Sequence, residues 1–214
     1  MVLGFDTSNY TTSVAISDGV GGKNCSRLLD VKPGELGLRQ SDALFAHIKR
    51  LPELVDALCA SVNIGNVTAI GVSTRPRAVE GSYMPCFLAG VNAAAAFALG
   101  KGIPLIHTTH QQGHIAASLW SAGRLELMQT PHLAWHLSGG TTELLLVTPD
   151  GKTVRAEKLG GTSDISAGQQ IPPFHMPVEV GLGVQNADLR HRLRAFTDRQ
   201  PAPDEIDDLL QPPD

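Results

Sequence analysis

Apolar and polar residues alternate in two separate parts of the chain, and each time a polar turn interrupts the alternation. The first part runs from Val2 to Ile16 around a turn at 6–11, and the second from His132 to Val147 around a turn at 138–142. Alternation with a period of two is typical of half-buried β-strands. The pattern therefore predicts two β-hairpins.

A helical period follows the first hairpin. Apolar residues between Ser41 and Val62 recur at a spacing near 3.6, with Ser41 as the expected N-cap. Proline lacks the amide hydrogen that a helix interior needs, so we expect Pro52 to end or kink this helix near Leu51.

Two further helices and two buried strands are predicted by uninterrupted apolar runs. The alanine-rich run 87–100 predicts a buried helix, because it is shorter than the ~20 residues that span a membrane. The segment 110–120 also has a helical pattern. Short apolar runs at 67–73 and 104–106 predict buried parallel strands.

The two hairpins match each other when one is shifted by 130 positions (141 − 11 = 130). Ser8 then falls on Ser138, and Thr11–Thr12 on Thr141–Thr142. A repeated hairpin that opens a βα series predicts a duplicated α/β protein, with one polar turn on each wall of a cleft. We expect a first lobe at 1–106, an inter-lobe helix at 107–131, the start of a second lobe at 132–169 and a divergent tail at 170–214.

The tail differs in composition from the rest of the chain. It holds seven of the 14 prolines: Pro172, Pro173, Pro177, Pro201, Pro203, Pro212 and Pro213. No βαβ pattern is visible after Gln169. We therefore expect the second lobe to be left incomplete by truncation or a frame shift near residue 169.

Composition narrows the class of protein. The net charge of −4 argues against a bulk electrostatic grip on nucleic acid or on an anionic membrane, although Arg75 and Arg77 leave room for a local basic patch. The three cysteines form no C-x-x-C pair, and the N-terminus shows no secretory signal. These features predict a cytoplasmic protein with reduced thiols and no membrane association.

Paired histidines are the strongest metal-ligand pattern. In His107-Thr-Thr-His110-Gln-Gln-Gly-His114, the last two histidines have the i, i+4 spacing that lets two imidazoles on one helix face share a metal ion. Zinc peptidases place a glutamate after the first histidine, and Gln111 in that position disfavours a protease. Two surface or capping histidines remain the alternative.

Three polar segments are candidate ligand contacts. The turn Ser138-Gly139-Gly140-Thr141-Thr142 offers backbone donors and hydroxyls to a phosphate. Asp6, at the end of the first strand, offers a carboxylate to a cation or water beside a nucleotide. The glycine-rich turn in Lys158–Gly168 offers Asp164 and Gly168 to a ribose or substrate. An ordinary hairpin turn, an Asx turn at Asp6 and a helix cap near Ser163 are the respective structural alternatives.

Together these residues resemble the catalytic-subunit family of tRNA threonylcarbamoyladenosine synthase, long misnamed glycoprotease, in a divergent bacterial branch. The resemblance covers residues 2–169, in the stretches Gly4-Phe-Asp6-Thr-Ser8, Gly102-Ile-Pro-Leu105, His110-Gln-Gln-Gly-His114, Ser138-Gly-Gly-Thr-Thr-Glu143 and Leu159-Gly-Gly-Thr-Ser-Asp164-Ile-Ser-Ala-Gly168. It implies an actin-like ATPase fold (sugar kinase and Hsp70 class) of two RNase H-like lobes around a nucleotide, the second one incomplete here.

The resemblance also implies the chemistry: transfer of a threonylcarbamoyl group from its adenylate to N6 of adenosine 37 in tRNA. By resemblance, His110 and His114 are ligands of one divalent metal, either iron or zinc, with magnesium as a further option. Ser138–Thr142 lie near the metal and phosphates, and Asp164 and Gly168 contact ATP or the threonylcarbamoyl-adenylate. The implied partners are tRNA and other synthase subunits or a second copy of the chain.

Several positions depart from the family pattern. Arg75-Pro76-Arg77 stands where the family has Gly-Pro-Gly, and Thr141 replaces a histidine. The aspartate that serves as third metal ligand has no counterpart after Gln169, and no general base is evident. The sequence therefore leaves three interpretations: a threonylcarbamoyltransferase that the missing part could leave inactive, a non-catalytic partner protein of the same fold, and a small-molecule kinase of this fold class.

Overall fold

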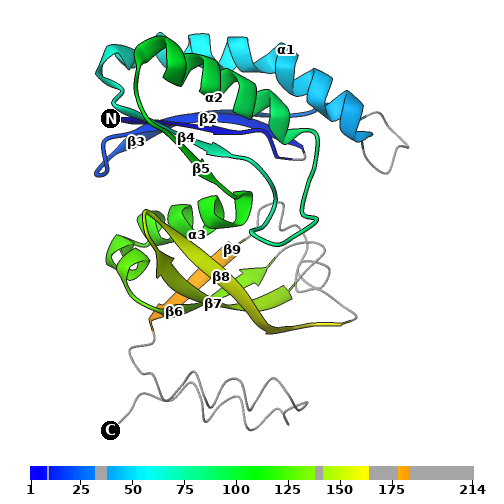
Figure 1. Ribbon diagram of the computed structural model, residues 1–214, viewed down its shortest axis with the longest axis vertical. Helices are drawn as coiled ribbons and strands as arrows, with labels where there is room; N and C mark the ends of the chain where they lie inside the picture. Colours follow the sequence, from blue (N-terminus) through cyan, green and yellow to red (C-terminus); the bar gives the residue numbers. More distant parts are fainter. Residues whose placement is uncertain (9, 32–37, 138–141, 164–177, 184–214) are drawn as a thin grey trace, which may run out of the picture. The chain divides into compact units, whose positions relative to one another are not determined.

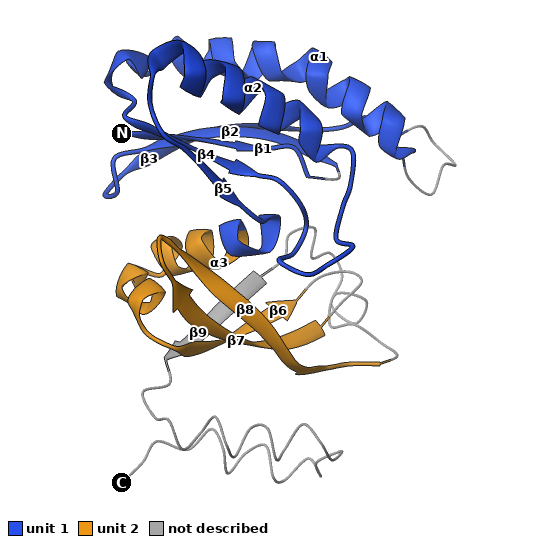
Figure 2. Ribbon diagram, in the orientation of Figure 1, with its two compact units in different colours: residues 1–113 blue, residues 114–214 orange. Residues whose placement is uncertain are grey.

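The computed structural model describes residues 1–8, 10–31, 38–137, 142–163 and, for the backbone alone, 178–183. The chain divides into two compact units, residues 1–113 and residues 114–214 (Figure 2). The division falls within one helix, α3 (His110–Ser121).

Unit 1 is built on a five-stranded mixed sheet of order β3-β2-β1-β4-β5. The strands β1 (Val2–Asp6), β2 (Thr11–Ser17) and β3 (Gly22–Leu28) form an antiparallel meander. The strands β4 (Ala69–Ser73) and β5 (Leu105–Thr108) are parallel to β1. The carboxyl ends of β1, β4 and β5 therefore meet at one edge of the sheet.

Two helices, α1 (Gln40–Cys59) and α2 (Phe87–Lys101), lie against one face of this sheet (Figure 1). A short 3₁₀ turn, η1 (Ile64–Asn66), precedes β4. The core between helices and sheet consists of apolar side chains that alternate along β1, β2 and β4 and recur along the helices, as the sequence patterns predicted. Its buried members are Leu3, Phe5, Val14, Ile16, Leu51, Leu58, Val67, Ile70, Val72, Ala89, Ala94 and Ala98.

Thr7 joins the end of β1 to the start of α2. Its fully buried hydroxyl donates to Cys86 O at 2.9 Å and accepts from Gly90 N at 3.1 Å. A Cβ at position 90 would lie 3.1 Å from Thr7 Oγ1, so glycine permits this close approach.

Unit 2 holds an antiparallel sheet of order β8-β7-β6-β9. Its strands are β6 (His132–Leu137), β7 (Thr142–Asp150), β8 (Thr153–Gly161) and β9 (Val178–Gly183). The 3₁₀ helix η2 (Leu125–Gln129) precedes β6. Ile115 and Leu119 of α3 form a second core with Leu127, Ala134, Leu145, Val147 and Val154.

The backbone register confirms the internal duplication. In the first hairpin Val2 pairs with Ser17, and in the second His132 pairs with Val147, so both partners are shifted by 130. The repeat holds for the central hairpin and its third strand and then diverges. The central strand of unit 1 has the parallel neighbour β4, whereas that of unit 2 has the antiparallel neighbour β9.

Three local expectations need correction. α1 begins at Gln40, without a side-chain cap from Ser41, and continues through Pro52 to Cys59. Pro52 is exposed, so water can reach the carbonyl that loses its partner, while buried Leu51 and Leu58 hold both halves of the helix on the core. β9 lies after Gln169, so a segment assigned to the divergent tail adds one strand to the sheet of unit 2.

No helix within the described part of the chain combines the length and apolar character needed to cross a membrane. The predicted strand 67–73 and helix 87–100 correspond to β4 and α2.

Candidate functional site

Asp6, predicted as a candidate ligand contact, ends the central strand of unit 1 and uses both carboxylate oxygens. Oδ1 accepts the backbone N–H of Ser8 at 2.8 Å, which is the Asx turn that formed the structural alternative. Oδ2 accepts the Ser73 hydroxyl at 2.5 Å and faces His110 Nδ1 at 2.9 Å. The turn thus leaves one oxygen to gather side chains from elsewhere in the fold.

His110 is the first residue of α3, directly after the loop that leaves β5. Its side chain is 34% exposed and that of Asp6 is 26% exposed, so the pair lies at the surface of unit 1 rather than deep inside it. The second ring nitrogen, Nε2, lies 3.4 Å from Ser8 Oγ. The Phe87 ring meets the imidazole edge-on, with centroids 6.5 Å apart.

A capping box sets the start of α3. The Thr109 hydroxyl accepts from Gln112 N at 3.2 Å, and Gln112 Oε1 accepts from Thr109 N at 2.8 Å. The two side chains thereby satisfy donors that a helix start leaves open. Neither residue was among the predicted site residues, although the pattern Thr-x-x-Gln immediately before an apolar helix face is a recognisable signal.

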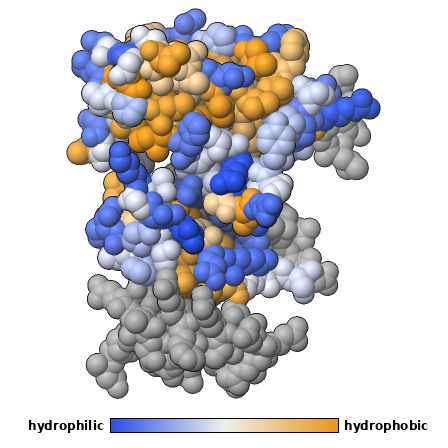
Figure 3. Space-filling model, in the orientation of Figure 1, coloured by the Kyte–Doolittle hydropathy of each residue, from blue (hydrophilic) through white to orange (hydrophobic). Residues whose placement is uncertain are grey.

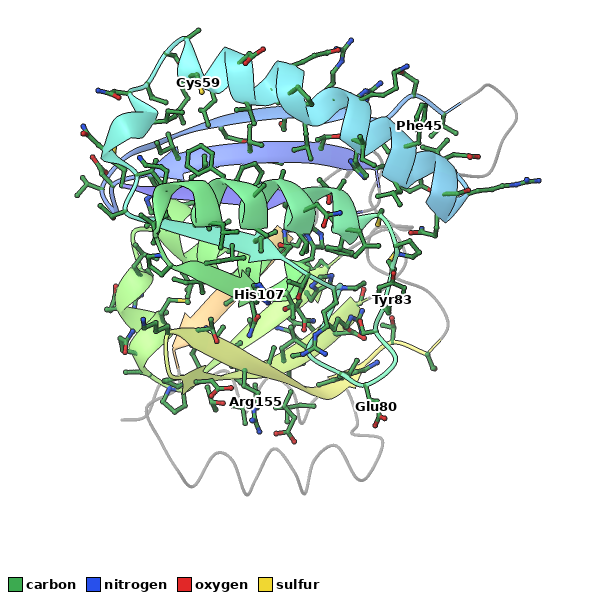
Figure 4. All side chains as sticks on the ribbon, turned by 45° about the horizontal axis from the view of Figure 1, so that its top comes forward. Phe45, Cys59, Glu80, Tyr83, His107 and Arg155 are labelled. Carbon is green, nitrogen blue, oxygen red and sulfur yellow. The ribbon has the colours of Figure 1, made fainter. Side chains whose placement is uncertain are left out.

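The loop after β4 also fixes α3. His110 N donates to Arg75 O and Gln111 N donates to Pro76 O, both at 3.0 Å. Arg75-Pro76-Arg77, the segment that stands in place of Gly-Pro-Gly, therefore holds the start of α3 through its main-chain carbonyls. Figure 4 shows Glu80 and Tyr83 further along the same loop and His107 on β5.

The environment of Asp6 favours its charged form. Partial burial by itself raises the pKa of the carboxyl group, but the hydrogen bond and the charge of His110, with the donors from Ser73 and Ser8, together hold the pKa well below its usual range. Asp6 is therefore a carboxylate that only accepts hydrogen bonds.

His114 lies four residues after His110 on α3 and belongs to unit 2. Its ring meets that of His136 on β6 at right angles, with centroids 6.3 Å apart. His136 pairs across the sheet with Glu143, whose buried carboxylate forms an ion pair with Lys158 at 3.1 Å. His136 and Lys158 were not among the predicted site residues.

The start of β7 and the end of β8 meet in unit 2, at the described ends of the two glycine-rich segments. Thr142 begins β7, Gly161 ends β8 opposite Glu143, and Thr162 N donates to Thr142 O at 3.0 Å. A Cβ at position 161 would clash with Thr142 O, so this approach requires glycine. Ser138, Gly139, Gly140, Thr141, Asp164 and Gly168 lie outside the described residues.

Metal ligation depends on the set of donors that the fold brings together. Among the described residues, no group of three or more histidine, cysteine, aspartate or glutamate side chains is arranged to hold a metal ion. His110 nevertheless has the environment of a metal-binding imidazole, because such residues usually give their other ring N–H to a carboxylate. The residue therefore fits a ligand role.

The strand order of unit 1 and the register repeated in unit 2 define the class of protein: a duplicated, RNase H-like α/β fold of the actin-like ATPase type. The predicted fold class is thereby confirmed. A family model described as tRNA N6-adenosine threonylcarbamoyltransferase matches residues 35–187. The chain belongs to this family of tRNA-modifying transferases.

Curated relatives carry the same description. One from Dehalococcoides mccartyi (strain CBDB1) is 32% identical over 173 residues, which cover 78% of this chain and 50% of the relative. One from Thermosipho africanus (strain TCF52B) is 33% identical over 175 residues, 79% of this chain and 49% of the relative. The chain thus spans about half the length of the curated relatives that it matches.

Among solved structures, YeaZ from Pseudomonas aeruginosa has a TM-score of 0.46 and 16% sequence identity. The comparison covers 73% of this chain and 63% of that one.

Proposed function

We propose that this chain takes part in threonylcarbamoyl transfer from the adenylate to N6 of adenosine 37 in tRNA, in the cytoplasm. The observation that carries the proposal is the contact between His110 and Asp6. It places a histidine of the family's H-x-x-x-H segment at the edge where β1, β4 and β5 end. In parallel α/β sheets, ligands bind beyond the carboxyl ends of the strands.

His110 and His114 are the proposed ligands of one divalent metal, iron or zinc with magnesium as a further option. Their spacing on α3 directs both side chains to one side of the helix, which is a property of this helix alone. When bound, the metal supplies Lewis-acid polarisation of the carbamoyl carbonyl or of the adenylate phosphate. The capping box and the loop carbonyls hold His110 at the helix start.

The proposed contacts for ATP or the threonylcarbamoyl-adenylate are Ser138–Thr142, Asp164 and Gly168. The contact between Thr142 and Thr162 supports this assignment, since it brings the start of β7 and the end of β8 to the same edge of unit 2. Glycines there allow a phosphate to approach backbone N–H groups.

The full chain can be tested with threonylcarbamoyl-adenylate and unmodified tRNA, with modified adenosine detected by mass spectrometry of the digested tRNA. We expect product from the wild type and none from His110→Ala. His107→Ala is the matched control, since His107 is an exposed histidine on β5 outside the proposed site, and it should retain product formation. Equal activity of the wild type and His110→Ala would contradict the assignment of His110.

We further propose that unit 1 associates with another synthase subunit or a second copy of the chain through its helices. Each helix exposes apolar residues at helical spacing: Phe45 and Ile48 on α1, and Leu88 and Leu99 on α2. Figure 3 shows apolar side chains gathered over this part of unit 1, and Figure 4 shows Phe45 on α1. Exposed apolar surface of this kind marks interaction sites.

Light scattering after size exclusion tests the association. The wild type should show a mass above that of the monomer, alone or with a synthase subunit, and Phe45→Ser should reduce it. Val20→Ser is the control, because Val20 is 91% exposed but lies in the β2–β3 turn. An assembly unchanged by Phe45→Ser would place the interface elsewhere.

A further inference from the structure

We propose that Asp6 positions His110 for metal binding: its carboxylate holds the proton on Nδ1, so that Nε2 is the atom that binds the metal. This inference rests on the proposed function, in which His110 is a metal ligand, and makes Asp6 the residue that orients it. It also assigns Asp6 a role different from direct contact with a nucleotide.

The hydrogen bonds around Asp6 leave it one orientation. Oδ1 is held by Ser8 N at 2.8 Å, within the turn that follows β1. Oδ2 is held by the Ser73 hydroxyl at 2.5 Å, from the end of β4. With both oxygens fixed from two neighbouring strands, the carboxylate presents Oδ2 to His110 Nδ1 at 2.9 Å.

The imidazole is fixed from the other side as well. The main-chain N–H of His110 donates to Arg75 O in the loop after β4. The Thr109–Gln112 capping box sets the first turn of α3. The Phe87 ring packs edge-on against the imidazole. Little movement of His110 is therefore possible without breaking several of these contacts.

The proton position follows from the chemistry of the two groups. An ionised carboxylate can only accept, so His110 Nδ1 must carry the hydrogen between them. Whenever the imidazole is neutral, the lone pair therefore lies on Nε2, and this is the form that can bind a metal ion. The Ser8 hydroxyl, 3.4 Å from Nε2, is a long and weak donor that a metal ion can displace.

Ser8, His110 and Asp6 also follow the order of a nucleophile, a base and its orienting acid. The structure favours metal binding over this use, because Ser8 is only 8% exposed and its hydroxyl lies 3.4 Å from Nε2. An acyl group would have little access to that hydroxyl.

Asp6→Asn is the decisive variant. The amide oxygen of the new side chain is expected to remain with Ser8 N, which turns the amide NH₂ toward His110. That NH₂ would donate to Nδ1 and move the proton to Nε2, where it blocks the metal. With the full chain freed of metal and titrated with Zn²⁺ alone, we expect Asp6→Asn to weaken binding about 10- to 100-fold.

The tautomer provides a readout that does not depend on metal binding or activity. Long-range ¹H–¹⁵N spectra of the metal-free protein should show His110 protonated at Nδ1 in the wild type and at Nε2 in Asp6→Asn. The signal is assigned by its loss in His110→Gln. Asp18→Asn makes the same chemical change in an exposed turn and should alter neither the tautomer nor Zn²⁺ binding.

The outcomes separate this inference from the proposed function. If His110→Ala abolishes Zn²⁺ binding while Asp6→Asn leaves both the affinity and the tautomer unchanged, the positioning role is wrong and the metal site stands. If His110→Ala leaves Zn²⁺ binding unchanged, the metal site and the positioning role both fail. Labelling of Ser8 by a fluorophosphonate, lost in Asp6→Asn, would overturn the proposal in favour of a serine nucleophile.

Discussion

His110 Nδ1 lies 2.9 Å from Asp6 Oδ2, although 104 residues separate the two in the chain. Asp6 belongs to the end of β1, and His110 follows β5. These strands are not neighbours, because β4 lies between them and contributes Ser73 to the same carboxylate. The contact therefore depends on the order of the three parallel strands. The contribution of Asp6 to the free energy of unfolding can be measured.

Acid should weaken the contribution of Asp6 to stability. The pKa of this group is lower in the folded protein than its ordinary value of 3.8, so the unfolded chain binds more protons as the pH falls. The contribution is complete above the unfolded pKa and is lost as the pH falls through the folded pKa. Urea denaturation of metal-free protein between about pH 6 and pH 2 should show a smaller loss of stability in Asp6→Asn than in the wild type. Parallel pH profiles would contradict the lowered pKa.

The capping box should stabilise α3 measurably. Thr109→Ala removes the side-chain acceptor for Gln112 N and should lower the free energy of unfolding by about 1 kcal/mol. Gln112→Ala should have a similar effect, and the double variant should cost less than the sum, because each bond supports the other. Urea denaturation of the three variants measures these differences.

Ser41→Ala is the matched control for the capping box. Ser41 has the sequence context of a cap, but it makes no capping hydrogen bond in the structure. Its replacement should change the free energy of unfolding only slightly. If Ser41→Ala lowered the free energy of unfolding as much as Thr109→Ala, the effect of Thr109→Ala could not be attributed to its capping hydrogen bond.

Gly161→Ala should destabilise unit 2. The new Cβ would clash with Thr142 O and crowd Glu143 Cα, and these backbone atoms of β7 cannot move without disturbing the pairing with β8. We expect a loss of about 1–3 kcal/mol, the usual range for overpacking. Gly71→Ala is the control within a strand, since no atom lies within 4 Å of its Cβ position. Thermal denaturation of both variants checks the difference.

Thr7→Val tests the link between β1 and α2. The substitution keeps the shape of the side chain but leaves Cys86 O and Gly90 N without the buried hydroxyl that bonds both. The loss of a buried hydrogen bond costs about 0.5–1.5 kcal/mol net. Thr68→Val also removes a bond to a backbone oxygen, but at an exposed position where water can replace the hydroxyl, and it should have little effect. Equal losses in urea denaturation would contradict the importance of burial.

Local periodicity explains which predictions the structure confirms. Alternation along 2–16 and 132–147 predicted the hairpins β1–β2 and β6–β7, and the apolar run at 87–100 predicted α2. The end of α1 was predicted wrongly because the cost of Pro52 is local, whereas the core contacts that offset it come from the sheet. β9 was missed although Val178, Val180 and Leu182 alternate with Glu179, Gly181 and Gly183, because this short run stands alone in a proline-rich tail with no βαβ pattern around it.

The sequence by itself determined the elements, the repeat and the histidine spacing on α3, since these depend on residues near one another in the chain. It also identified Asp6 and His110 separately. Only the tertiary structure joined them and added Ser73, which no motif contained. The physical reason is that a strand order of β1-β4-β5 brings three carboxyl ends together, and side chains at those ends become neighbours irrespective of their distance along the chain.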